Sequence, residues 1–117
     1  MATLNNLKKM ALSFPEATEL PHFENLSFRV KHKIFATFSS TNYLVCVKLT
    51  DIDQSSFCAI DHKVMYPVPN KWGKIGWTFI DLKKVKQEML LDALTTAYCT
   101  VAPKKLSKPY TELRKQI

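Results

Sequence analysis

The chain has 117 residues, of which 46% are hydrophobic and 23% are charged, and this composition is typical of one folded globular domain. Only two glycines are present, Gly73 and Gly76, which excludes both the glycine fingerprint of dinucleotide-binding folds and the phosphate-binding P-loop. Lys and Arg outnumber Asp and Glu by 17 to 10, and the net charge of +7 favours an anionic partner such as nucleic acid, with simple solubility as the alternative.

The first part of the chain predicts one helix followed by an antiparallel meander. Thr3 is a suitable N-cap, and a helical pattern of apolar residues follows it until Pro15. The hydrophobic period then changes to two. We expect strands at 25–30, 33–38 and 43–49, and 19–23 is a candidate edge strand.

A two-residue turn at Lys31-His32 fixes an expected register, in which residue 28 pairs with 35 and residue 27 with 36. One face of the hairpin, which we expect under the helices, then carries Leu26, Phe28, Val30 and Phe35. The other face carries Asn25, Ser27, Arg29, Ile34, Ala36 and Phe38. This mixed face is either a binding surface or a surface that another segment covers. Arg29 either serves a ligand or lies along its neighbours and pairs with an acid such as Glu19 or Glu24.

The second part predicts two more helices and a strand. Thr50 and Asp53 resemble a capping box that opens a short helix ending at Ile60. The segment 66–69 contains two prolines and is expected to be an extended loop, and 76–81 to be a strand. Asp81 is expected to cap a long helix that Pro103 ends. Its apolar stripe consists of Val85, Met89, Leu90, Ala93, Leu94, Ala97, Tyr98 and Val101.

These elements predict an α+β fold, an antiparallel β-sheet with helices packed on one face. We expect a single domain over 1–103 and a basic C-terminal tail over 104–117, which holds five basic residues and one acidic residue. The sequence shows neither a signal peptide nor an apolar run long enough for a membrane span. We therefore expect a soluble, cytoplasmic protein with no membrane partner, as a monomer or weak dimer.

No motif in the sequence calls for catalysis, a metal or a cofactor. Cys46, Cys58 and Cys99 are not spaced as a metal knuckle, and the three histidines lie far from one another and from the cysteines. A nucleophile elbow is also absent. The expectation is therefore a non-enzymatic protein with no metal and no cofactor, in which the cysteines are structural thiols of a reducing compartment.

The segment 70–77 concentrates both tryptophans, both glycines and two lysines within eight residues. Aromatic side chains interleaved with lysines can stack on bases and bind phosphate. Trp77 alternates with Phe79, so we interpret it as a core residue. Trp72 is either a surface anchor or a lid on the core.

Five segments in order give the chain a wider resemblance: 11–16, 21–23, 27–36 (the strands Ser27-Phe28-Arg29-Val30 and Lys33-Ile34-Phe35-Ala36), 72–77 and 97–105. Together they resemble the MmcQ/YjbR-like family of small proteins. The resemblance implies an α+β fold of the CyaY-like or double-wing kind, and it implies DNA binding through analogy of fold. It implies no catalytic residue. His32 departs from the glycine that the family often has in its hairpin turn, so a type I′ turn here carries strain.

The leading hypothesis is therefore a binding module for nucleic acid. The candidate contact residues are Arg29, Lys48, Lys71, Trp72, Lys74, Lys104 and Lys105. The alternative is a module for a protein or a small ligand that uses the mixed face around Ser27, Arg29, Ala36 and Phe38.

Overall fold

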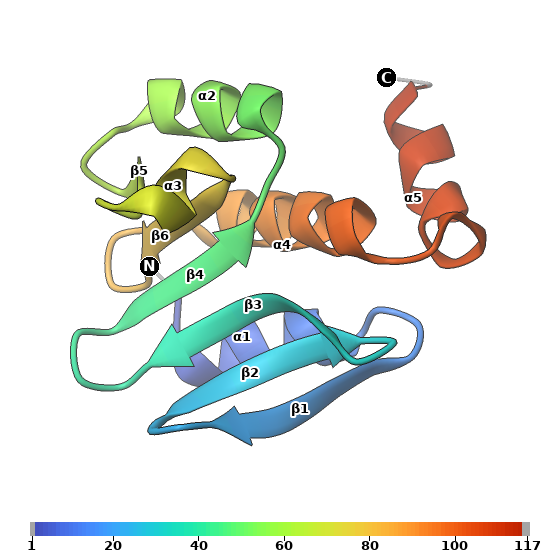
Figure 1. Cartoon of the computed structure of the whole chain (residues 1–117), viewed down its shortest axis with the longest axis horizontal. Coiled ribbons are helices and arrows are strands. Elements are labelled where there is room, and N and C mark those ends of the chain that lie inside the picture. Colours follow the sequence, from blue (N-terminus) through green and yellow to red (C-terminus); the bar gives the residue numbers. More distant parts are fainter. Residues whose placement is uncertain (1, 116–117) are drawn as a thin grey trace.

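A computed structural model describes residues 2–115, with side chains described through Thr111. Figure 1 shows the arrangement of its helices and strands. The helices are α1 (Leu4–Leu12), α2 (Asp51–Ile60), α3 (Lys71–Lys74), α4 (Gln87–Val101) and α5 (Lys104–Lys115). The strands are β1 (Ala17–His22), β2 (Asn25–Val30), β3 (Lys33–Ser39), β4 (Leu44–Lys48), β5 (Met65–Pro67) and β6 (Trp77–Asp81).

All six strands form one antiparallel sheet in the order β1-β2-β3-β4-β6-β5. Helix α4 packs on β3 and β4, α1 packs on α4 and β1, and α2 packs on β5. Figure 1 shows α1 and α4 behind the sheet. The predicted α+β fold, with helices on one face of an antiparallel sheet, is confirmed.

The predicted starts of α1 and α2 are confirmed by their caps. The Thr3 side chain accepts a hydrogen bond from the backbone N–H of Asn6, and the Asn6 side chain accepts one from the Thr3 N–H. At α2 the Thr50 hydroxyl oxygen accepts from the N–H of Asp53 at 3.2 Å. Each cap satisfies a backbone donor that has no partner inside its own helix.

The core lies between the sheet and α4. Leu90, Leu94 and Tyr98 on α4 are fully buried, as the predicted stripe requires. The Tyr98 ring stacks on Phe14, with 4.8 Å between ring centroids, and its hydroxyl donates to the Pro15 carbonyl at 2.7 Å. The end of α1 is thereby tied to α4.

A β-bulge in β3 makes the expected register wrong beyond the turn. Val30 pairs with Lys33 and Arg29 with Ile34 as expected, but Phe28 pairs with Ala36 because Phe35 is an extra residue. The bulge reverses the alternation that follows it. Ala36 and Phe38 consequently lie on the helix-covered face with Phe28, where all three are buried. The Lys31-His32 turn has the strained backbone that a type I′ turn requires, because both residues have positive φ.

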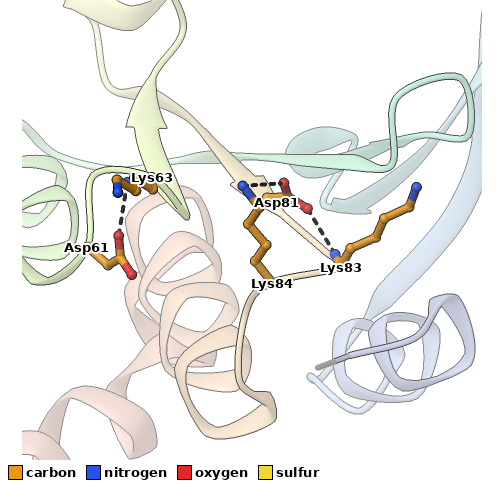
Figure 2. A network of polar contacts seen from close by, with 5 residues as sticks. All are labelled: Asp61, Lys63, Asp81, Lys83 and Lys84. Carbon is orange, nitrogen blue, oxygen red and sulfur yellow. Dashed lines mark hydrogen bonds and ion pairs between the residues drawn. The ribbon is translucent and has the colours of Figure 1, made fainter.

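Two local expectations in the second half of the chain were also wrong. The sequence predicts a loop over 66–69, but residues 65–67 form β5 at the edge of the sheet, where Pro67 pairs with Thr78. An edge strand tolerates proline because one side of it needs no donor. Asp81 does not cap α4, which begins only at Gln87. Its carboxylate instead accepts from the Lys83 N–H at 3.0 Å and caps the intervening turn, as Figure 2 shows.

The basic segment after Pro103 forms helix α5, which contacts α4. Leu106 and Tyr110 are partly buried against the core, and the Tyr110 ring lies edge-on to Phe14 and Tyr98. Residues 104–111 thus contribute to packing as well as charge. No helix in residues 2–115 is long and apolar enough to cross a membrane.

Candidate binding groove on the open face of the sheet

Within residues 2–115, α1 and α4 pack on one face of the sheet, and the opposite face carries only the short helix α3 beside β6. The residues of this open face follow from the pleat. On β6, Thr78 and Ile80 point to the helices and are buried, so Trp77 and Phe79 point to the opposite, open face. The register extends this face across the neighbouring strands. Its members there are Asn25, Ser27, Arg29, Ile34, Thr37, Cys46, Lys48 and Tyr66.

A groove of about 450 Å³ lies on this open face. Its floor comes from the sheet and its two walls from the β1–β2 turn and the α3 region. The lining residues are His22, Asn25, Ile34, Thr37, Cys46, Val68, Trp72, Trp77 and Phe79. The floor is mostly apolar, with amide, hydroxyl and imidazole groups available to orient a ligand.

The wall at α3 is held in place by two close backbone approaches. A Cβ on Gly73 would lie 1.8 Å from the Val68 carbonyl oxygen, and one on Gly76 would lie 1.8 Å from the Leu49 oxygen. Gly76 also has φ +109°, a backbone conformation that glycine adopts without steric cost. Gln54 adds a side-chain bond to the Gly73 carbonyl at 2.9 Å. These contacts fix the helix that carries Trp72.

Both tryptophans of the chain line the groove. Trp72 is 51% exposed and forms part of the rim, which supports the surface-anchor interpretation over the lid. The expectation that Trp77 belongs to the core is wrong. Trp77 does alternate with Phe79, but the buried positions of β6 are the intervening Thr78 and Ile80. Phe79 also contacts Tyr66 edge-on, with 5.8 Å between ring centroids, and extends the aromatic surface toward β5.

The two predicted cations on the sheet lie on this open face. Arg29 pairs in register with Ile34, a groove residue, and its Nε donates to the Ser27 hydroxyl at 3.0 Å. Within the described residues Arg29 has no carboxylate partner, and Glu19 pairs with Lys8 instead. The Lys48 ammonium donates to the Ile75 carbonyl. Since an ammonium has three donors, this bond leaves capacity for a ligand.

Lys71 and Lys74 are exposed on α3, on either side of Trp72 in the sequence. The Lys71 ammonium lies 5.7 Å from the centre of the Trp72 ring. Both lysines border a shallow hollow that shares Val68 with the groove. The α3 region therefore carries two exposed positive charges, and that of Lys71 lies next to the exposed ring of Trp72.

Comparisons with known proteins agree with this architecture. The family model YjbR matches residues 12–100. The chain belongs to the YjbR family. A search of curated proteins gave no match. In the crystal structure of Deinococcus radiodurans protein DR2400, described as domain DUF419, a similar fold occurs at 20% sequence identity with a TM-score of 0.74. That similarity covers 86% of this chain and 78% of the other, and it supports the fold alone.

The remaining candidate cations of this YjbR-family protein lie away from the groove. A hydrogen bond from Lys31 lowers the pKa of Glu16, and the nearby charge of Lys105 acts in the same direction. Lys105 is thus close to Glu16, just before β1, whereas His22 at the other end of β1 lines the groove. Neither Lys104 nor Lys105 is a lining residue of the groove. Lys104 and Lys105 form a second cationic group at the start of α5.

The alternative site around Ser27, Arg29, Ala36 and Phe38 is corrected in part. Ser27 and Arg29 lie on the open face, but Ala36 and Phe38 lie in the core because of the bulge. The expected positions of Asn25 and Ile34 on this face are confirmed, and the structure adds His22, Thr37 and Cys46 to them in the groove. The alternation of Cys46 with buried Val45 and Val47 was the available signal for its position. The alternation of β2 already places Asn25 on the mixed face with Arg29, whereas no local signal identifies His22.

Cys46 has the environment of an unreactive thiol. Burial raises its pKa from 9 to about 12, although the Thr78 backbone acts weakly in the opposite direction. The thiolate, which is the nucleophilic form, is therefore disfavoured at neutral pH. The described residues also contain no group of three or more His, Cys, Asp or Glu side chains placed to hold a metal ion.

Proposed function

We propose that this YjbR-family chain is a non-enzymatic module that binds nucleic acid on the open face of its sheet, with unpaired bases in the groove. The observation that carries the proposal is the half-exposed Trp72 at the rim of an uncovered aromatic groove, with Lys71 and Lys74 on the same short helix. A contiguous exposed apolar surface with polar groups at its rim is typical of a ligand-binding groove.

The chemistry of the groove suits flat, unpaired bases. Trp72, Trp77 and Phe79 offer ring surfaces, and base-aromatic stacking depends little on base identity. Asn25 and Thr37 offer donors and acceptors to the base edges. Lys71 and Lys74 are exposed beside the groove and Arg29 lies next to Ile34 in its lining, so these cations are the contacts that we propose for the phosphates of the same strand. A duplex exposes no base face, so the groove favours single strands.

The proposal is tested by fluorescence anisotropy with a labelled oligothymidylate of about eight nucleotides, within the usual range of single-strand sites. Trp72→Ala should weaken binding roughly 5- to 150-fold, the equivalent of one lost stacked base. The double variant Lys71→Ala, Lys74→Ala should make the log-log salt slope shallower by about 1.4, at ~0.7 for each phosphate contact.

Lys104→Ala, Lys105→Ala is the matched control, because it removes the same charge from a site away from the groove. It should leave the slope for the short oligonucleotide unchanged. Failure of the wild-type protein to bind the oligonucleotide even at low salt would refute the proposal.

A second candidate function, binding of a protein segment or small apolar ligand, is favoured by one observation. Leu20 and Ile75 are also exposed, and they lie respectively on the groove-side face of β1 and directly after α3. Aliphatic side chains pack on apolar side chains of a partner rather than stack on bases. Binding of this kind would show little dependence on salt, which separates it from the first proposal.

We further propose a cytoplasmic location and a monomeric or weakly dimeric state. A reducing compartment is supported by the cysteines, since none of the three forms a disulfide.

A further inference from the structure

Phe23, in the turn between β1 and β2, is 93% exposed to solvent. Its backbone also has a φ of +58°, in the left-handed region that asparagine and glycine adopt far more readily than phenylalanine. The side chain therefore gains little burial, and the backbone is in a costly conformation. Folding alone gives no reason for phenylalanine at this position.

Two of the other residues with positive φ, Tyr43 and Glu16, have interactions that offset the strain. The Tyr43 ring lies edge-on to Phe38, with 5.3 Å between ring centroids, and the Lys83 ammonium lies 5.3 Å from the centre of the Tyr43 ring. Glu16 is engaged in an ion pair with Lys31 at 2.6 Å. The aromatic contact of Phe23 is with the ring of its neighbour His22, at 4.8 Å. That contact leaves almost all of the Phe23 ring surface open.

The position of Phe23 connects it to the groove. His22 before it and Asn25 two residues after it both line the groove. His22 and Asn25 therefore form one wall of the site, with Phe23 in the turn that joins them, and Trp72 contributes to the opposite lining from α3. Both walls thus carry an exposed aromatic ring.

We infer that Phe23 is a ligand-contacting residue that stacks on a base at the β1–β2 rim of the groove. This inference rests on the proposed function and adds a second stacking position to that of Trp72. The strained backbone of Phe23 is then explained by ligand binding, because the exposed ring makes stabilising contacts only when a ligand covers it. A flat ring of the ligand is required, because the sugar-phosphate backbone offers nothing for phenylalanine to stack on.

The test is the variant Phe23→Asn, which suits the left-handed backbone and removes the ring. We expect a melting temperature equal to or above that of the wild type. Affinity for the labelled oligothymidylate should fall roughly 5- to 150-fold, while affinity for an abasic oligonucleotide of equal length should not change. Phe23→Trp should retain binding because it keeps an aromatic ring. Ile52→Ala, which truncates another apolar residue that is 80% exposed, is the control and should bind like the wild type.

Each other outcome has a definite meaning. If Trp72→Ala weakens binding but Phe23→Asn does not, the inference about Phe23 is wrong and the proposed function stands. If Phe23→Asn lowers the melting temperature and weakens both oligonucleotides equally, the ring is structural and the inference is again wrong. If the wild-type protein binds no oligonucleotide, the proposed function and this inference fail together.

Discussion

Replacing Gly73 with alanine tests whether the α3 wall of the groove is built as described. The new Cβ would lie 1.8 Å from the Val68 carbonyl oxygen, whereas ordinary contacts begin at 3.4 Å, so backbone must move by about 1.6 Å. Such overpacking costs roughly 1–3 kcal/mol. Displacement of α3 would also break the hydrogen bond from Gln54 to the Gly73 carbonyl, which lowers the free energy of unfolding by about 1 kcal/mol more.

The sum predicts a loss of about 2–4 kcal/mol, which for a domain of this size lowers the melting temperature by roughly 10 °C. Because Trp72 moves with α3, oligonucleotide affinity should also fall at temperatures where the variant remains folded. Thermal unfolding followed by circular dichroism, together with anisotropy, measures both effects. Lys74→Ala in the same helix is the stability control and should change the free energy of unfolding by less than about 0.5 kcal/mol. Wild-type stability of Gly73→Ala would refute the packing of α3 on Val68.

Three further predictions concern the core, the groove thiol and the second cationic group. Leu94→Ala should lower the free energy of unfolding by about 2–5 kcal/mol, because Leu94 is fully buried. Chemical denaturation measures this loss, and an unchanged midpoint would show that this face of α4 does not pack in the core. The pKa of Cys46 is raised from 9 to about 12 in the folded state, so its contribution to stability is present below pH 9 and is lost between pH 9 and 12. Cys46→Ala should therefore show a smaller loss of stability over that range, and rapid alkylation of wild-type Cys46 at neutral pH would show instead that the thiol is activated. A long duplex can reach Lys104 and Lys105 as well as the cations beside the groove. With such a duplex, the double variant Lys104→Ala, Lys105→Ala should make the log-log salt slope shallower by roughly two without altering sequence preference. An unchanged slope would exclude these two lysines as phosphate contacts.

The sequence predicted most of the fold because its strongest signals are local. The cap at Thr3, the alternation in 25–30 and the apolar stripe ending before Pro103 each correspond to an observed element. The sequence could not reveal the bulge at Phe35, because Phe35 and Ala36 are both apolar and both are buried. Tertiary packing, not alternation, decides which of two adjacent apolar residues is the extra one.

The candidate site was only partly predictable for a related reason. Trp72, Lys71 and Lys74 are neighbours in the sequence, so their association was visible as a short motif. The opposite wall comes from the β1–β2 turn, about 50 residues earlier, and only the order of the strands brings it to the same groove. The sequence could not predict which face of the sheet carries Trp77, because alternation divides the residues of a strand between two faces but does not show which face the helices cover.

We propose that the open face of the sheet is the surface that binds the ligand. Nuclear magnetic resonance tests it most directly, because both tryptophans of the chain line the groove and their two indole N–H signals report on it. On titration with oligothymidylate at low salt, both indole signals should shift together with the backbone amides of Ile34, Thr37 and Cys46. Shifts confined to α4 and α5, with both indole signals unchanged, would contradict the claim.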